Sequence, residues 1–150
     1  MEIRLAWRGA FTSAEANRLH AQAFGSGVFA DEEWDWRRLV ETHSLGWVTA
    51  RSDDRLVGFV NVPWDGAMHA FIVDTVVSVR TQRQGIGTRL IDIAAHEASA
   101  AGCEWLHVDF EEGHRAFYLD ACGFRLTPAG LRALGPQREG TGVAGPAPGC

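Results

Sequence analysis

The most informative segment of the chain is Val77-Ser78-Val79-Arg80-Thr81-Gln82-Arg83-Gln84-Gly85-Ile86-Gly87-Thr88. It follows a run rich in β-branched residues and precedes an amphipathic stretch, so it predicts a junction between a buried strand and a helix. Such a junction leaves the first N–H groups of the helix unpaired and directs them at one place. Those groups, together with the helix dipole, favour a phosphate group as ligand.

The side chains of the junction agree with a phosphate ligand. Gly85 and Gly87 remove side chains where a ligand would approach the backbone, and Thr88 adds a hydroxyl. Positive charge comes from three arginines, Arg80, Arg83 and Arg89. The alternative is a plain strand–helix turn with glycines for tight packing. A Walker loop is excluded because no Gly-Lys-Ser/Thr is present, and the full dinucleotide fingerprint is also absent.

The rest of the chain divides into strands and helices around this junction. Strands are expected at 3–7, 45–51, 56–62, 70–79 and 105–110, and a last strand or hairpin at 124–134. Helices are expected at 12–24 with a capping box between Thr12 and Glu15, from Asp31 through Val40, from the glycine loop to about Gly102, and at 114–122. This order predicts a single α+β or mixed α/β domain.

Composition narrows the class of protein. With 150 residues and 46% hydrophobic content, the chain suits one domain with a real core. Its net charge of −5 argues against a nucleic-acid partner. We expect no membrane span and no signal peptide, and therefore a cytoplasmic location. Residues 1–134 are expected to form the domain, and the Gly- and Pro-rich residues 135–150 a disordered tail.

Two motifs in order resemble one family. Gln82-x-x-Gly85-x-Gly87 is similar to motif A of the GNAT N-acetyltransferases, and Phe117-Tyr118-Leu119-Asp120-Ala121-Cys122-Gly123-Phe124 is similar to their motif B. The resemblance covers roughly residues 2–134 and implies the GNAT fold. That fold is expected to be a mixed central sheet of about six to seven strands, flanked by about four helices and splayed between strands 4 and 5.

The resemblance also implies a cosubstrate, acetyl-CoA, and no metal. The residues expected to bind it are Val77 and Val79 through their backbone, and Gln82, Arg83, Gln84, Gly85, Ile86, Gly87 and Thr88 around the pyrophosphate. Gln82 and Arg83 stand where many members have Arg-Gly, and Val79 where a proline is common. Glu111 stands near a position where many members carry an Asn that touches the cofactor.

The resemblance implies that an amine attacks the thioester directly. The protein then needs a base that takes a proton from the amine and an acid that protonates the leaving thiolate. Tyr118 is the candidate general acid, because a phenol is protonated at neutral pH and can protonate a thiolate. The alternative role of Tyr118 is packing against the sheet. Asp74 is one candidate base, and Asp109 or Glu111 at the end of the next expected strand is another.

The acceptor is expected to be a small-molecule or peptide amine, and the resemblance leaves the choice between monomer and homodimer open. Trp34, Trp36 and Trp64 could border an acceptor pocket as an aromatic wall, or could be packing residues. A second function kept open is a module that binds or senses acyl-CoA without turnover.

Overall fold

The computed structural model describes residues 2–25 and 27–137. Its elements follow in the order β1 (Ile3–Trp7), α1 (Ser13–Phe24), α2 (Trp36–His43), β2 (Ser44–Ser52), β3 (Arg55–Pro63), β4 (His69–Val77), α3 (Ile86–Ala100), β5 (Trp105–Val108), a 3₁₀ turn (Glu112–His114) and a π-helix (Ala116–Ala121). Most of the predicted elements are therefore present, in the predicted order.

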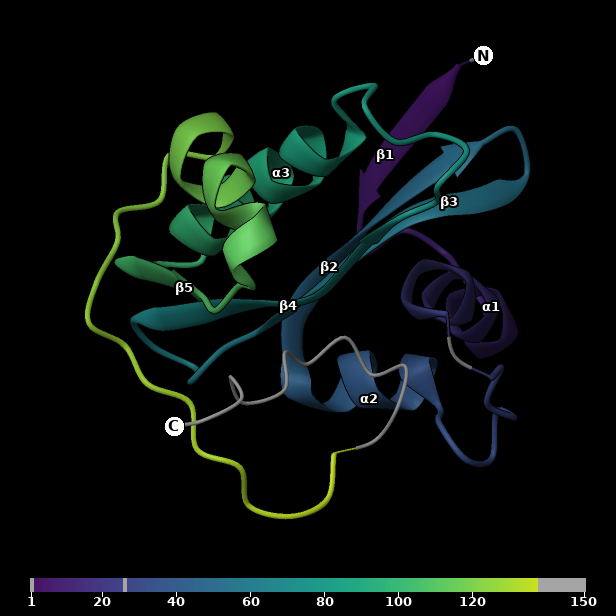
Figure 1. The fold of residues 1–150 in the computed structure, drawn as a ribbon, viewed down its shortest axis with the longest axis horizontal. Coiled ribbons are helices and arrows are strands. Elements are labelled where there is room, and N and C mark those ends of the chain that lie inside the picture. The colour runs from purple at the N-terminus through teal and green to yellow at the C-terminus, as the bar shows by residue number, and fades with distance from the viewer. Residues whose placement is uncertain (1, 26, 138–150) are drawn as a thin grey trace.

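One mixed sheet organises the fold, with strand order β1-β2-β3-β4-β5. The first three pairings are antiparallel, and β4 and β5 pair in parallel through the α3 crossover. Helix α3 covers one face of the sheet, while α1 and α2 cover the other (Figure 1). This α+β arrangement confirms the predicted fold class.

The number of strands is lower than predicted. The sheet has five strands among the described residues, whereas six to seven were expected. The expected last strand at 124–134 is irregular, and Leu126, Leu131 and Leu134 are exposed. Pro128 and Gly130 explain the difference, since proline removes a backbone donor and glycine weakens a strand. About four helices were expected, and the described residues form three α-helices and one π-helix, besides a 3₁₀ turn.

Two strand limits also differ from the sequence prediction. β4 was expected to run through Val79 but ends at Val77. β5 was expected as a buried strand over 105–110, but it has four residues and lies at the sheet edge, with Trp105 52% exposed. A strand at an edge has a neighbour on one side only, so part of its surface faces solvent.

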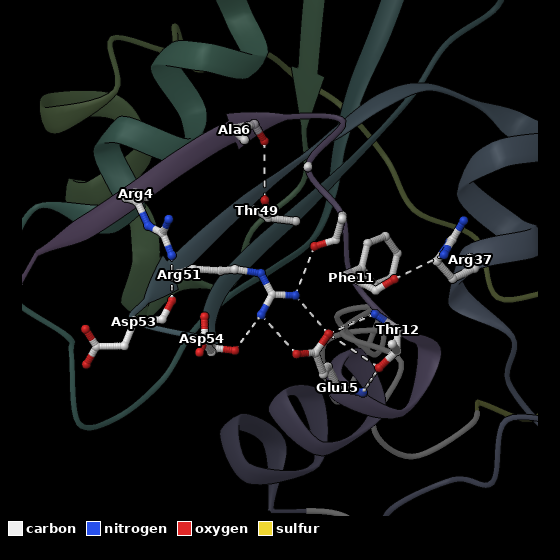
Figure 2. A network of polar contacts seen from close by, with 12 residues as sticks. Arg4, Ala6, Phe11, Thr12, Glu15, Arg37, Thr49, Arg51, Asp53 and Asp54 are labelled. Carbon is white, nitrogen blue, oxygen red and sulfur yellow. Dashed lines mark hydrogen bonds and ion pairs between the residues drawn. The ribbon is translucent and has the colours of Figure 1, made fainter.

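Helix α1 begins where the sequence predicts. The Thr12 hydroxyl accepts from the Glu15 backbone N–H at 3.1 Å, and the Glu15 carboxylate accepts from the Thr12 N–H at 2.9 Å, which completes a capping box. Arg51 of β2 donates both terminal nitrogens to the same carboxylate, at 3.0 and 2.9 Å, and also donates to the Ala10 carbonyl (Figure 2). One carboxylate thus joins the start of α1 to the sheet.

Helix α2 begins later than predicted. The sequence placed its start near Asp31, but the helix starts at Trp36 with Asp35 as its N-cap. The Asp35 carboxylate accepts from the Arg38 N–H at 3.1 Å and from the Ser13 hydroxyl at 2.9 Å. These bonds fix the helix start and join it to α1, because Ser13 is the first residue of that helix.

The two faces of the sheet have separate cores. Between α3 and the sheet lie Val48, Val60, Val62, Ile72, Ile86 and Leu90. Between α1, α2 and the sheet lie Phe11, Leu19, Trp36, Val40, Phe59 and Val76. Phe59 and Val60 are neighbours on β3 that point to opposite cores, as strand alternation requires. Side chains near the centre of the sheet can therefore be assigned to one face or the other.

Candidate functional site

The central feature of the candidate site is the separation of β4 and β5. These strands pair only from His69↔Trp105 to Ile72↔Val108. β4 continues to Val77 while β5 ends at Val108, so the second half of β4 has no partner strand on that side among the described residues. This separation corresponds to the splay that the family resemblance implies between strands 4 and 5. Backbone groups of an unpaired strand half are available to a ligand.

A β-bulge lies in this unpaired half of β4. Asn61 pairs with Val73 and Phe59 with Val76, so one extra residue is inserted in β4 between these pairs. Asp74 takes a positive φ of 57° there, which is uncommon for a residue other than glycine. Ile72 and Val76 would share a face under strict alternation, but they belong to opposite cores, so the extra residue shifts the alternation between them. Asp74 then lies on the face of Val76, and Thr75 lies on the opposite face.

Asp74 faces the α1 and α2 side, where Asn61 hydrogen-bonds to its carboxyl group. Ser44 donates its hydroxyl to the Asn61 side-chain oxygen, which leaves the Asn61 amide N–H for Asp74. Burial raises the pKa of Asp74 to about 7, and the hydrogen bond from Asn61 opposes this in part. A carboxyl group with a pKa near neutrality can accept a proton and release it at physiological pH.

His20 of α1 lies against the backbone of the bulge on the same face of the sheet. Its Nε2 lies 3.3 Å from the Asp74 carbonyl oxygen and its Nδ1 lies 2.8 Å from the Ala16 carbonyl oxygen. Burial lowers the pKa of His20, and a neutral ring donates to only one of the two carbonyls. The ring stacks on Trp36 at a centroid distance of 4.3 Å. This packing fixes the backbone of the bulge against α1.

The start of α3 leaves its backbone donors free of side-chain caps. Gly85 is the N-cap, with φ of 75°, and no side chain hydrogen-bonds to this cap. Residues 82–85 are exposed, and Arg83 also has a positive φ, 63°. Gln84 precedes the cap, and Ile86 is buried beneath the first turn. Uncapped backbone donors and a nearby arginine are the features that favour an anion, and the anion site itself stays a prediction.

Three predicted cofactor residues lie differently from the expectation. Val79 is 62% exposed in the turn after β4 and is not on the strand. Gln82 turns back and donates its amide Nε2 to the Val77 carbonyl at 3.2 Å. That bond orders the turn, but it also occupies the Val77 carbonyl that was expected to face the cofactor. The amide of Ser78 donates to the Val57 carbonyl at 2.7 Å, which ends the pairing with β3.

Tyr118 lies on the opposite face of β4 from Asp74. It is 7% exposed and belongs to the core beneath α3. Its ring stacks on Phe110 and packs edge-on against Phe117 and Phe124. Burial raises the pKa of its phenol, which therefore stays protonated at neutral pH.

Thr75 is the polar neighbour of Tyr118. Its buried hydroxyl makes no hydrogen bond of good geometry within the described residues, yet it lies near enough to the phenol to lower the pKa of Tyr118 in part. The Thr75 hydroxyl is therefore a polar neighbour of the phenol without the geometry of a regular hydrogen bond. Thr75 of β4 thus lies beside the candidate acid on one face of the sheet, and its neighbour Asp74 is the candidate base on the other face.

The structure does not bring Glu111 into this group. Glu111 is exposed, precedes the 3₁₀ turn and accepts from the His114 N–H through its backbone carbonyl at 2.8 Å. Asp109 is also exposed. Neither carboxylate makes a hydrogen bond or ion pair with the candidate site in the part of the chain that the structure describes. Sequence reasoning missed Asn61, Ser44 and His20, which only the strand register and the packing of α1 bring to Asp74.

The three tryptophans have different surroundings. Trp36 is 1% exposed, donates Nε1 to the Asn17 side chain at 2.9 Å and is a core residue, so it is not part of a pocket wall. Trp34 lines an open depression of about 340 Å³, beside Glu32, Glu33 and Asp35. Trp64 packs against the core beneath α3. Of the three, Trp34 is the one whose place beside a depression supports the predicted pocket role.

None of the described helices combines the length and the apolar character needed to cross a membrane. Residues 138–150, which include most of the expected tail at 135–150, lie outside the described residues. The expected division at residue 134 therefore stays a prediction.

Comparison with known proteins relates the chain to one family. The model of the acetyltransferase (GNAT) family matches residues 11–124. No curated protein sequence matches the chain.

A probable acetyltransferase of unknown function from meticillin-resistant Staphylococcus aureus aligns with a TM-score of 0.74 at 20% identity, over 90% of this chain and all of that one. Glucosamine-6-phosphate N-acetyltransferase from Arabidopsis thaliana gives 0.71 at 15% identity, over 89% and 98%. An aminoglycoside acetyltransferase from an uncultured soil metagenomic sample gives 0.72 at 15% identity, over 91% and 97%. At these identities the likeness concerns the fold, and the family match rests on the sequence: the chain belongs to the GNAT acetyltransferase family.

Proposed function

We propose that this acetyltransferase moves an acetyl group from acetyl-CoA to a primary amine by direct attack, without a covalent enzyme intermediate. The observation that carries the proposal is the bulge of β4. Asp74 extends from it to one face of the sheet, and Thr75 meets Tyr118 on the other. A base on the amine side and an acid on the thiol side are what this reaction needs.

The residues around α3 suit the pyrophosphate of acetyl-CoA. Uncapped N–H groups follow Gly85, and Arg83 adds positive charge beside them. The unpaired half of β4 offers backbone groups to the pantetheine arm, next to the gap left by β5. We assign pyrophosphate binding to residues 82–88 and the pantetheine arm to the backbone of 77–79, with the Val77 carbonyl released from Gln82 when the arm binds.

Asp74 is the base that we favour. It is partly exposed, so an acceptor or a water molecule can approach it, and its pKa of about 7 allows it to take a proton from an ammonium group. Asp109 and Glu111 are weaker candidates, because both are exposed and, among the described residues, neither makes a hydrogen bond or ion pair with the bulge. The charge of Asp109 instead helps to raise the pKa of Tyr118.

Tyr118 is the acid that we favour. The raised pKa keeps its hydroxyl protonated at neutral pH, so that a proton is in place for the leaving thiolate. The burial of the ring among Phe110, Phe117 and Phe124 holds the hydroxyl in one place.

The acceptor is a small-molecule or peptide amine. The depression beside Trp34 carries Glu32, Glu33 and Asp35, which is compatible with a cationic amine, although Arg38 also lines it. The names of two structural relatives include an amino-sugar phosphate and aminoglycosides. These are acceptors of those proteins, and here they serve as members of a test panel.

A second candidate function is acyl-CoA binding without turnover. The observation in its favour is Glu111, which stands near the position where many family members use an Asn to contact the cofactor. A carboxylate there could weaken productive binding of the pantetheine arm.

Thiol release from acetyl-CoA separates the two functions. The assay would use the full chain with alkyl polyamines, amino sugars, aminoglycosides, amino acids and peptide N-termini, and would measure free CoA. Amine-dependent release that falls in Asp74→Asn supports transfer. Tight CoA binding by calorimetry, with release no faster than hydrolysis for every amine, would support the binding module and reject our proposal.

A further inference from the structure

Two histidines from neighbouring strands meet on the sheet face opposite α3, outside the residues used above. His69 Nδ1 and His107 Nε2 are 2.8 Å apart and share a hydrogen bond. His69 is the first residue of β4, and His107 lies in β5 opposite Phe71. Residues two apart on a strand share a face, so His69 and Phe71 lie on the same side as His107.

Both imidazoles are held by their surroundings. The His107 ring stacks on Phe71 with a centroid distance of 4.9 Å and an interplanar angle of 20°. The backbone N–H of His69 donates to the Asp65 carboxylate at 3.1 Å. Both histidines also lie in paired strands, so their Cα positions are fixed by the sheet. Preorganised ligands lose little conformational freedom on binding.

The nitrogen separation fits coordination of one metal ion. Imidazole nitrogens bind such ions at about 2.0–2.1 Å, and two of them at the right angle of a square-planar or octahedral ion, as for Cu²⁺ or Ni²⁺, lie about 2.9 Å apart. Imidazole suits Ni²⁺, Cu²⁺ and Zn²⁺. The pair would need to exchange its shared proton for the metal and carry N–H on the outer nitrogens. That requires a change of tautomer, and both rings must turn about their side-chain torsions so that the two nitrogens point at one metal ion, because their centroids are 5.0 Å apart and the rings now face each other along the hydrogen bond. The strands themselves need not move.

The local charge also suits a cation. The Asp65 carboxylate accepts from the backbone N–H groups of His69 and Ala67, at 3.1 and 2.7 Å, which places a negatively charged side chain at the start of β4 beside His69. In the part of the chain that the structure describes, no group of three or more His, Cys, Asp or Glu side chains could hold a metal ion. Water would therefore complete the coordination.

From these observations we propose that His69 and His107 form a site for a divalent transition-metal ion, which joins β4 to β5 across the sheet. The site is independent of the proposed acetyl transfer. It bridges the two strands where they are paired, just before they separate beyond Ile72 and Val108. A metal held there would favour the folded sheet, since a ligand that binds only the native state stabilises it.

Nickel titration of the untagged full chain tests the proposal. Isothermal calorimetry with NiCl₂ near neutral pH should give one site in the wild type, weakened about tenfold or more in His69→Gln and in His107→Gln. His96→Gln is the matched control, because His96 is exposed on α3, away from the pair. Nickel should raise the melting temperature of the wild type and of His96→Gln, and should not raise that of the other two variants.

Failure of this proposal is readily recognised. An absence of nickel binding in the wild type would overturn it, as would equal affinity in His107→Gln and the wild type. An equal loss of affinity in His96→Gln would assign the binding to other histidines and would overturn it too. Apo melting temperatures close to that of the wild type would show that the variants fold. None of these results depends on acetyl transfer.

Discussion

Gly87, on the first turn of α3, faces the ring of Phe117 so closely that a methyl group at position 87 would lie 3.1 Å from two ring carbons. The π-helix and α3 are therefore packed together at this glycine. Gly85 differs, because a methyl group there would meet nothing within 4 Å but would have to adopt a φ of 75°. One glycine serves packing and the other serves backbone conformation.

Gly87→Ala should destabilise the protein in spite of the better helix propensity of alanine. Alanine gains up to about 1 kcal/mol in a helix, whereas overpacking costs about 1–3 kcal/mol. In a Phe117→Leu background the ring is gone, and the same substitution should become neutral or stabilising. Urea unfolding of the four variants of this cycle measures the coupling. Equal effects of Gly87→Ala in both backgrounds would exclude the packing role.

Local signals in the sequence were sufficient for the helices and most strands. The capping box of Thr12 and Glu15 depends on residues three apart, and the structure confirms it. The Gly85 turn and the Val-rich strand before it are local in the same way. Asp31 was the wrong start for α2, because Asp35 has a partner in Ser13 that is distant in sequence.

Long-range pairing explains what the sequence did not predict. The run rich in Val and Ile at 70–79 predicts an uninterrupted strand. The observed pairing with β3 instead has one extra residue in β4 near Asp74. That bulge brings Asn61 to the carboxyl group, and no local pattern announces it. The strand or hairpin expected at 124–134 was wrong for a different reason, since Pro128 and Gly130 interrupt this segment.

Glu15→Gln should cost about 1–2 kcal/mol at neutral pH, because the charged hydrogen bonds from Arg51 are lost. The hydrogen bond from Arg51 is the main cause of the lowered pKa of Glu15. A lowered pKa gives stability that is present above the unfolded value of 4.5 and is lost as the pH falls through the folded pKa. The difference between wild type and variant should therefore shrink in acid.

Urea unfolding at several pH values between neutral and strongly acidic checks this expectation. Glu41→Gln is the matched control, since Glu41 pairs with Arg37 on the exposed surface of α2 and contributes only about 0.3–0.5 kcal/mol. The side chains of Arg51 and Glu15 are only 22% and 21% exposed. Similar losses in the two variants would contradict the anchoring role of Glu15.

Asp74→Asn should change the dependence of stability on pH in the opposite direction. A carboxyl group with a folded pKa of about 7 and an ordinary value of 3.8 stabilises the fold below pH 3.8, and this contribution is lost as the pH rises toward 7. Asparagine does not titrate. The variant should gain stability relative to wild type by up to about 1.4 kcal/mol per pH unit in this window.

Chemical denaturation of both proteins between pH 4 and 8 measures this gain. Asp65→Asn is a suitable control, because backbone N–H groups of His69 and Ala67 lower the pKa of Asp65. Asp65 titrates below pH 4, so the difference in unfolding free energy between Asp65→Asn and the wild type should stay constant between pH 4 and 8. A constant difference for Asp74→Asn as well would mean that Asp74 is ionised in the folded protein throughout.

The same residue should control the pH dependence of catalysis. If Asp74 is the base, kcat/KM in the wild type should rise with pH and level off above an apparent pKa near 7. Asp74→Asn should lower kcat/KM by about 10²-fold or more for an alkylamine. An acceptor amine that is already neutral at the assay pH should lose much less, because no base is needed to deprotonate it.

Two further variants distinguish the alternative bases. Asp109→Asn and Glu111→Gln should keep most of the activity, since both side chains are exposed and, among the described residues, neither makes a hydrogen bond or ion pair with the bulge. A larger loss in either of them than in Asp74→Asn would transfer the role to that residue.

Tyr118→Phe should lower kcat by about tenfold or more and leave CoA affinity near that of the wild type. Phenylalanine keeps the ring contacts with Phe110, Phe117 and Phe124, so only the hydroxyl is lost.

Phe110→Leu is the control for packing, because it changes those ring contacts and leaves the hydroxyl in place. If packing were the only role of Tyr118, Phe110→Leu would reduce stability and kcat while Tyr118→Phe left kcat unchanged. Steady-state kinetics with saturating amine, together with calorimetric titration of CoA, separates proton donation from packing, because only the hydroxyl can protonate the leaving thiolate.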